Sequence, residues 1–107
     1  MQIRALVEAG VCGLKTEVML KGSMEEEYQI LLSSNCPLVQ SLEPKLQDMD
    51  LLMAAVGRFT QNPVFQAAET SGLHAACPVP TALIKAFEVF CGLALPADSR
   101  IIIDKKA

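Results

Sequence analysis

Polar and apolar residues alternate with a period of two over the first third of the chain. The alternation runs through residues 3–9 and 14–20 and returns at 28–32. This period is typical of strands that bury one face and expose the other. Only short breaks, at residues 10–13 and 21–27, separate the three runs. Short connections favour neighbouring antiparallel strands, so we predict a three-stranded meander.

The spacing of apolar residues then becomes helical, and residues that commonly begin helices divide the segment. Cys36-Pro37, Asp50 and Asn62-Pro63 are three such signals, and the second predicted helix runs from Leu51 to about Phe59. Pro44 should kink or end the first helix. The clearest helix follows the proline-rich segment 78–80, and Gly92 ends it. Its apolar stripe contains Leu83, Ile84, Phe87, Phe90 and Cys91.

Three consecutive β-branched residues, Ile101–Ile103, predict a last strand that pairs at a sheet edge or with the first strand. The predicted order is βββαααβ. It indicates an α+β fold: a four-stranded sheet, formed by the three-strand antiparallel meander plus the C-terminal strand, with three to four helices packed on one face. With 107 residues, we expect a single domain over 1–107.

Composition narrows the expected partners and compartment. The net charge is −3 and no basic patch stands out, so nucleic acid is not an expected partner. No apolar run approaches the ~18–20 residues of a membrane span, and Met1 leads into a strand pattern without a secretory signal. We therefore expect a cytoplasmic protein without a membrane partner, in which thiols stay reduced.

Three of the four cysteines occupy positions that expose a thiol. Cys12 lies in a Val-Cys-Gly turn, and Cys36 and Cys77 each precede a proline that can open a helix. His74, the only histidine, forms an H-x-x-C pair with Cys77. The positive end of a helix favours the thiolate, which is both a nucleophile and a metal ligand. The fourth, Cys91, lies on a helical apolar stripe and is interpreted as core packing.

These four residues predict a shared site. A meander brings Cys12 and Cys36 to one edge of the sheet, and His74 and Cys77 need only reach that edge. Thiolates and imidazole are ligands for zinc and for iron–sulfur clusters. The favoured hypothesis is therefore a metal-binding protein holding zinc or an iron–sulfur centre through Cys12, Cys36, His74 and Cys77, with a role in electron transfer or in metal or cluster handling. The paired C-x-x-C spacing of structural zinc sites is missing.

Two alternatives stay open, and the sequence does not decide whether the protein is an enzyme. One is a metal-free thiol redox or sulfur-carrier protein, with Cys36 or Cys77 as nucleophile and His74 as nearby base. The other is a non-catalytic interaction module with inert cysteines, which is a homodimer or binds a protein partner. Its basis is the 51% hydrophobic content in a short chain.

Two pairs of segments resemble a small uncharacterised family of stand-alone proteins of about 100 residues, mainly from anaerobic prokaryotes. The first pair is residues 10–13 and 34–37, and the second is 74–80, which reads HAACPVP, and 92–96. The resemblance covers nearly the whole chain, and H-x-x-C-P-V-P is its most specific part. It implies that Cys12, Cys36, His74 and Cys77 are the motif positions and that Cys91 lies outside them. It implies no activity, and an anaerobic setting would favour iron–sulfur chemistry over zinc.

Overall fold

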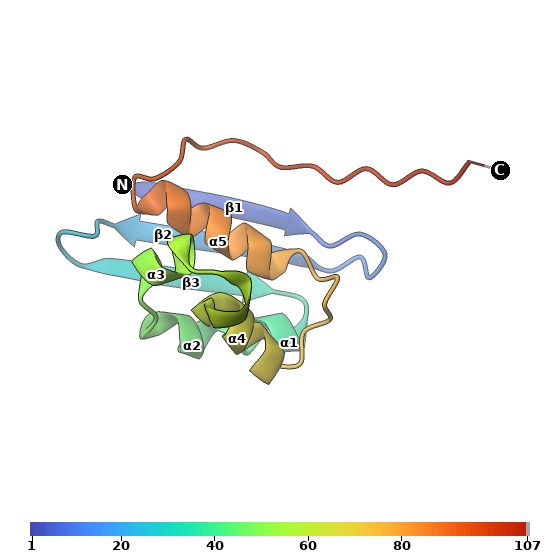
Figure 1. Cartoon of the computed structure of the whole chain (residues 1–107), viewed down its shortest axis with the longest axis horizontal. Helices are drawn as coiled ribbons and strands as arrows, with labels where there is room; N and C mark the ends of the chain where they lie inside the picture. Colours follow the sequence, from blue (N-terminus) through green and yellow to red (C-terminus); the bar gives the residue numbers. More distant parts are fainter. Residues whose placement is uncertain (107) are drawn as a thin grey trace.

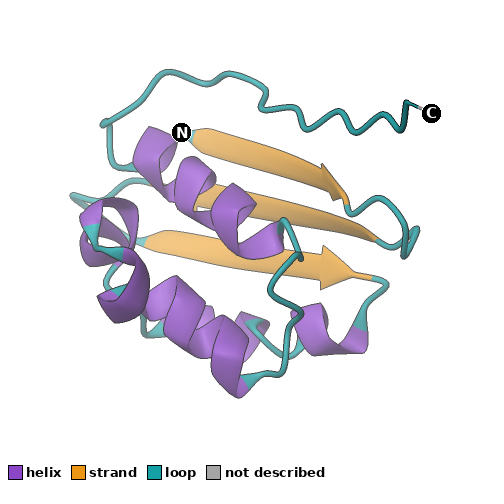
Figure 2. Cartoon of the chain, turned by 45° about the vertical axis from the view of Figure 1, so that its right-hand side comes forward, coloured by secondary structure: helices purple, strands orange, loops and turns teal. Residues whose placement is uncertain are grey.

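The computed structural model describes residues 1–106 as a sheet with helices on one of its faces (Figures 1 and 2). The three strands follow one another in the order β1-β2-β3, and both pairings are antiparallel. The predicted α+β class and meander are thus confirmed. The strands are β1 (Gln2–Glu8), β2 (Lys15–Gly22) and β3 (Tyr28–Ser34).

Alternation of side chains gives the sheet one dry face. Val18 lies opposite Ala5 on β1 and Leu32 on β3, and Val18 and Leu32 are buried. The opposite face carries polar and charged residues, including an Arg4–Glu17 ion pair at 3.2 Å. Alternate residues of each strand therefore face the core, as the period of two predicted.

The helices begin where the capping signals placed them. The Asp50 carboxylate accepts a hydrogen bond from the Met53 N–H, and the Asn62 side chain accepts one from the Val64 N–H. Pro44 lies in the first turn of a second short helix, so the segment predicted to kink there is divided into two helices. In chain order the helices are α1 (Pro37–Gln40), α2 (Glu43–Gln47), α3 (Leu51–Val56), the 3₁₀ turn η1 (Phe59–Gln61), α4 (Pro63–Thr70) and α5 (Val79–Phe90).

Asn62 joins α3, η1 and α4. Its side chain is almost completely buried, and its amide donates hydrogen bonds to the carbonyls of Ala54 and Gly57. The second predicted helix ends earlier than expected, at Val56 rather than near Phe59. Gly57, which follows Val56, adopts extended backbone and turns the chain toward Asn62.

The long helix α5 closes the core. It packs against β1 and β2, whereas α1 and α2 pack against β3. Leu83, Phe87 and Phe90 are buried, and the Phe90 ring meets Tyr28 of β3 edge to face at 5.7 Å between centroids. Burying a side chain of this size contributes roughly 1.5–3 kcal/mol to stability.

The predicted last strand is not formed. Residues 93–106 belong to no helix or strand, and Ile101–Ile103 pair with no strand among the described residues. The β-branched run favours extended backbone, but a strand also needs a hydrogen-bonded neighbour. Within residues 1–106, no helix is long and apolar enough to span a membrane.

Candidate functional site

The register of the sheet decides where two of the four predicted site residues lie. Glu8 pairs with Lys15, so the turn that contains Cys12 connects β1 and β2 beyond that pair. The Asn35 N–H donates to the Lys15 carbonyl, which brings the start of α1 to the same end of the sheet. Cys12 and Cys36 therefore occupy one end of the sheet, as the meander predicted. Helix α5 also begins at this end (Figure 1).

The thiols at this end differ in exposure. Cys12 is exposed in its turn, whereas Cys36 and Cys77 are half-buried and pack against the core. Cys36 is the residue before α1, but its side chain makes no capping hydrogen bond. The Cys77 N–H donates to the His74 carbonyl at 3.0 Å, so the H-x-x-C pair forms one tight turn.

Cys91 follows the last residue of α5, at the opposite end of that helix. It is half-buried and packs against the core, in line with its interpretation as core packing. Burial raises the pKa of the Cys91 thiol, and the nearby Asp50 carboxylate raises this pKa further. Both effects disfavour the thiolate, which is the reactive form.

A cavity of about 250 Å³ lies between α4 and the start of α5 and brings His74 and Cys77 together. Glu69, near the end of α4, also lines it. Cys12 and Cys36 do not line this cavity. The remaining lining is mostly apolar: Phe65, Ala68, Leu73, Ala75, Pro80 and Thr81.

Glu69 is not among the site residues predicted from the sequence, because its place in the cavity depends on how α4 ends. Gly72 has a positive φ of 79°, and the Leu73 N–H donates to the Ala68 carbonyl. This arrangement closes the helix and turns the chain back along it, so that His74 and Glu69 line one cavity. The glycine after the apolar run of α4 was the signal that could have suggested this proximity.

The four predicted ligands do not form a preformed metal site among the described residues. Within residues 1–106, no group of three or more histidine, cysteine, aspartate or glutamate side chains is arranged to hold a metal ion. Structural zinc needs four such ligands at about 2.0–2.3 Å. The residues present therefore do not fit a preformed zinc or iron–sulfur site in this conformation.

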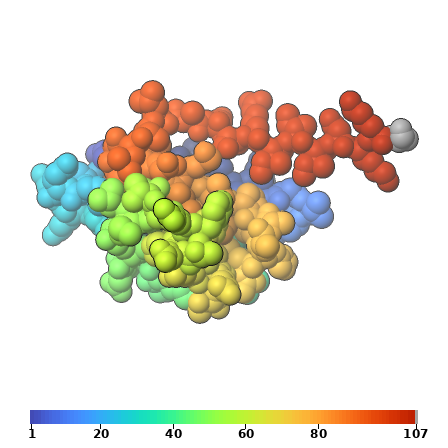
Figure 3. All heavy atoms as spheres, viewed as in Figure 1, coloured from blue at the N-terminus to red at the C-terminus, as the bar shows by residue number. Residues whose placement is uncertain are grey.

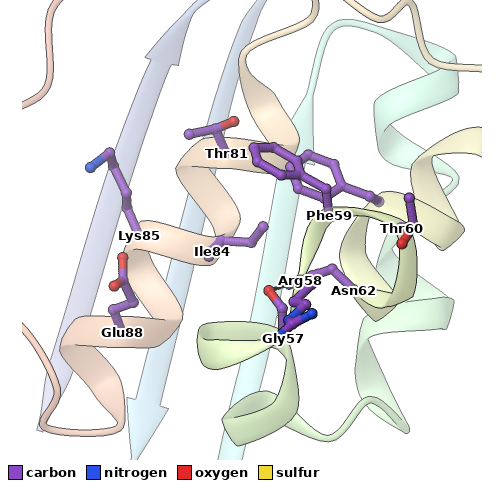
Figure 4. A pocket seen from close by; sticks show the side chains of 10 residues that line it. Gly57, Arg58, Phe59, Thr60, Asn62, Thr81, Ile84, Lys85 and Glu88 are labelled. Carbon is purple, nitrogen blue, oxygen red and sulfur yellow. Dashed lines mark hydrogen bonds between the residues drawn. The ribbon is translucent and has the colours of Figure 1, made fainter.

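A second, larger cavity of about 580 Å³ lies beside η1 and α5 (Figure 4). Phe59, whose side chain is 80% exposed, stacks on Phe65 with ring centroids 5.3 Å apart. Ile84 adds to the apolar lining, and Lys85 and Glu88 of α5 supply charged groups. This cavity contains no cysteine or histidine, so it offers an apolar surface rather than a reactive group.

The protein is thus an α+β domain with a three-stranded antiparallel sheet and a cavity, lined by His74 and Cys77, at the start of its longest helix. The chain belongs to a family of unknown function, DUF6951, whose model matches residues 3–103. The predicted membership of an uncharacterised family of domains of this size is thus confirmed. The chain matches no curated protein and no solved structure.

Proposed function

We propose that this chain is a thiol protein in which Cys77 is the nucleophile and His74 is the base. The observation that carries the proposal is that Cys77, His74 and Glu69 line one cavity. Cys77 would supply the sulfur, His74 would accept its proton, and Glu69 would orient the imidazole. A nucleophile beside a base, with a third group that orients the base, is the usual arrangement for covalent chemistry at a side chain.

The volume of the cavity limits the size of the substrate group that it can bind. Pockets for drug-sized ligands measure about 300–1,000 Å³, so a cavity of about 250 Å³ suits a small group or the end of a larger molecule. A disulfide or persulfide sulfur is such a group. In the exchange step the Cys77 sulfur bonds to the substrate sulfur, the S–S bond of the substrate breaks, and the leaving thiolate takes the proton from the imidazole.

Alkylation tests the proposal, because Cys36 and Cys77 are both half-buried and each precedes a proline. Iodoacetamide at pH 7, with mass spectrometry to follow each cysteine, should label Cys77 faster than Cys36. His74→Ala should slow the labelling of Cys77 by about tenfold or more, since general bases contribute roughly 10²–10⁴-fold, and leave Cys36 unchanged. Equal rates for the two thiols, or no effect of His74→Ala, would contradict the proposal.

Cys91 supplies a pH control in the same experiment. Because its pKa is raised above the ordinary value of 9.0, its labelling should lag behind that of Cys77 and increase only in more alkaline buffer.

The raised pKa of Cys91 should also make the stability of the protein depend on pH. Once the pH exceeds 9.0, the unfolded thiol ionises before the folded one, so the free energy of unfolding should fall. Cys91→Ala should remove this part of the pH dependence.

Metal binding, which the sequence favoured, is a second candidate because Cys12, Cys36 and the start of α5 share one end of the sheet. It requires the loops to bring the four ligands together when the metal binds. Metal analysis of protein purified without oxygen tests it, with Cys77→Ser as the variant and Cys91→Ser as the matched control. Stoichiometric zinc or iron that only Cys77→Ser removes would favour this function over thiol exchange.

A further inference from the structure

The outer edge of β3 is closed by side chains of the same chain. Gln40 of α1 donates to the Leu32 carbonyl at 2.9 Å and accepts from the Ser34 N–H at 2.8 Å. The Glu43 carboxylate accepts from the Leu32 N–H at 2.7 Å, and Gln47 donates to the Ile30 carbonyl at 3.0 Å. These four backbone groups of residues 30–34 are therefore satisfied within the chain, and a further strand could pair there only by displacing the side chains.

The outer edge of β1 is open. The Gly22 N–H donates to the Met1 carbonyl, and the Ala9 N–H donates to the Leu14 carbonyl. Since inward and outward groups alternate along an antiparallel strand, the odd-numbered residues of β1 bond to β2. The even-numbered residues direct their N–H and C=O groups outward, and within residues 1–106 these groups bond to no strand or side chain: Gln2, Arg4, Leu6 and Glu8.

The C-terminal segment, residues 93–106, pairs with no strand among the described residues and contains a run of three apolar side chains. The side chains of Ile101, Ile102 and Ile103 are 79–88% exposed. The segment passes on the β1 side of the molecule in the same direction as β1 (Figures 1 and 2), and it continues past the β1–β2 turn in the view of Figure 1. It projects from the body of the molecule in the space-filling view (Figure 3), and the longest dimension of the chain is 53 Å against 29 and 26 Å for the others.

We propose that the segment around Ile102 adds an antiparallel strand to the β1 edge of a second copy of this chain, and that the exchange is reciprocal. Pairing Ile102 with Leu6, which is 62% exposed, makes one apolar contact on the outer face. The neighbouring isoleucines then fall on the face that α5 covers. The three apolar pairs are Ile101 with Val7, Ile102 with Leu6, and Ile103 with Ala5.

The charges around the isoleucines fit this register. Counting outward from the Ile102–Leu6 pair, Arg100 falls opposite Glu8, and Asp104 falls opposite Arg4. Side chains that are directly opposite in an antiparallel pair share a face, so each pair would place opposite charges side by side. Arg100, Ile102 and Asp104 would bond to the even-numbered residues of β1, whose outward groups are free.

The chain cannot satisfy the same pattern with its own segment. That segment runs parallel to its own β1 (Figure 1), and centring Ile102 on Leu6 in parallel would place Arg100 by Arg4 and Asp104 by Glu8. Like charges would then meet at both positions. A two-fold axis across the strands reverses the direction and makes the pairing antiparallel, and such closed exchange is common in homodimers.

The length of the C-terminal segment also favours pairing with a second copy. The seven residues of β1 span about 23 Å at ~3.3 Å per residue. Residues 93–100, which start from the end of α5 beside the beginning of β1, span about 26 Å when extended. If this segment stays extended along β1, the isoleucines reach past the end of that strand, where a second copy can bind them.

Charge reversal tests the register and the exchange together. Analytical ultracentrifugation of the wild-type chain should show a dimer. Glu8→Arg alone and Arg100→Glu alone should each weaken it by about tenfold, because each turns two symmetric cross-strand pairs from opposite charges into like charges. An equimolar mixture of the two variants should regain wild-type affinity, since Arg100 of one chain meets Glu8 of the other and the reversed pair is complementary.

The matched control is Glu25→Arg, the same charge change at an exposed residue in the β2–β3 connection, which should leave the dimer unchanged. Circular dichroism would confirm that Glu8→Arg and Arg100→Glu stay folded, as their exposed side chains suggest. A monomeric wild type would overturn the proposal. A dimer that both reversals leave intact, or a mixture that fails to restore it, would overturn the proposed register and exchange.

Discussion

The two outer strands of the sheet end in different ways. On β3, the side chains of Gln40, Glu43 and Gln47 bond to four of the outward-facing backbone groups. Their spacing of three and four residues places them on one side of the helical segment, although the chain breaks between α1 and α2. On β1 the corresponding groups have no such cover from residues 1–106. The β3 edge is therefore covered over much of its length, and the β1 edge retains the pairing capacity that makes open edges sites of association.

Gln40→Ala should give the largest loss of stability, because it removes two hydrogen bonds from the β3 edge. Part-buried groups left without partners cost about 1–3 kcal/mol each, so we expect the free energy of unfolding to fall by about 2–3 kcal/mol in urea titrations. Gln29→Ala, at an exposed position of β3, is the control and should change it by less than about 0.5 kcal/mol. Equal losses would mean that the side-chain cover adds nothing.

Glu43 permits a finer test of the same edge. Glu43→Ala removes the acceptor for the Leu32 N–H and should cost about 2 kcal/mol, since hydrogen bonds to charged groups contribute roughly 1.5–3 kcal/mol. Glu43→Gln keeps an acceptor oxygen, so its loss should be about half as large. If the two variants unfold alike, the carboxylate is not acting as the acceptor.

Ending the chain at Ser99 should have the smallest effect on the isolated monomer, because residues 100–106 are exposed and belong to no helix or strand. In dilute solution the melting temperature should stay within about 1–2 °C of that of the whole chain. At higher concentrations the whole chain should gain stability through association while the shortened chain should not. A shortened chain whose melting temperature still rises with concentration would place the association elsewhere.

The sequence predicted what depends on neighbouring residues. The strands followed from alternation, and the helix starts followed from Asp50 and Asn62, because capping acts within three residues. The end of α3 was predicted too late, since Gly57 leaves the helix to meet Asn62, a contact that apolar spacing does not reveal. The prediction of a last strand was wrong because Ile101–Ile103 have the propensity for a strand but no partner strand within residues 1–106.

In the candidate site, too, local features were predictable from the sequence and those that depend on packing were not. His74 and Cys77 were paired correctly because one turn holds them together. Strand order was also sufficient to place Cys12 and Cys36 at one end of the sheet. The cavity itself was not predictable, because it forms between α4 and α5 and includes Glu69 from a different element. Packing between helices depends on the whole core, whereas a turn depends on four residues.

Asn62 has a consequence for the chemical durability of the protein. Asparagine side chains degrade when the backbone nitrogen of the next residue attacks the amide and closes a succinimide ring. Here the next residue is Pro63, whose nitrogen carries no hydrogen, and the Asn62 amide is itself held by the Ala54 and Gly57 carbonyls. The junction of α3 and α4 therefore rests on an asparagine that its neighbour protects from deamidation, and it should keep its hydrogen bonds as the protein ages.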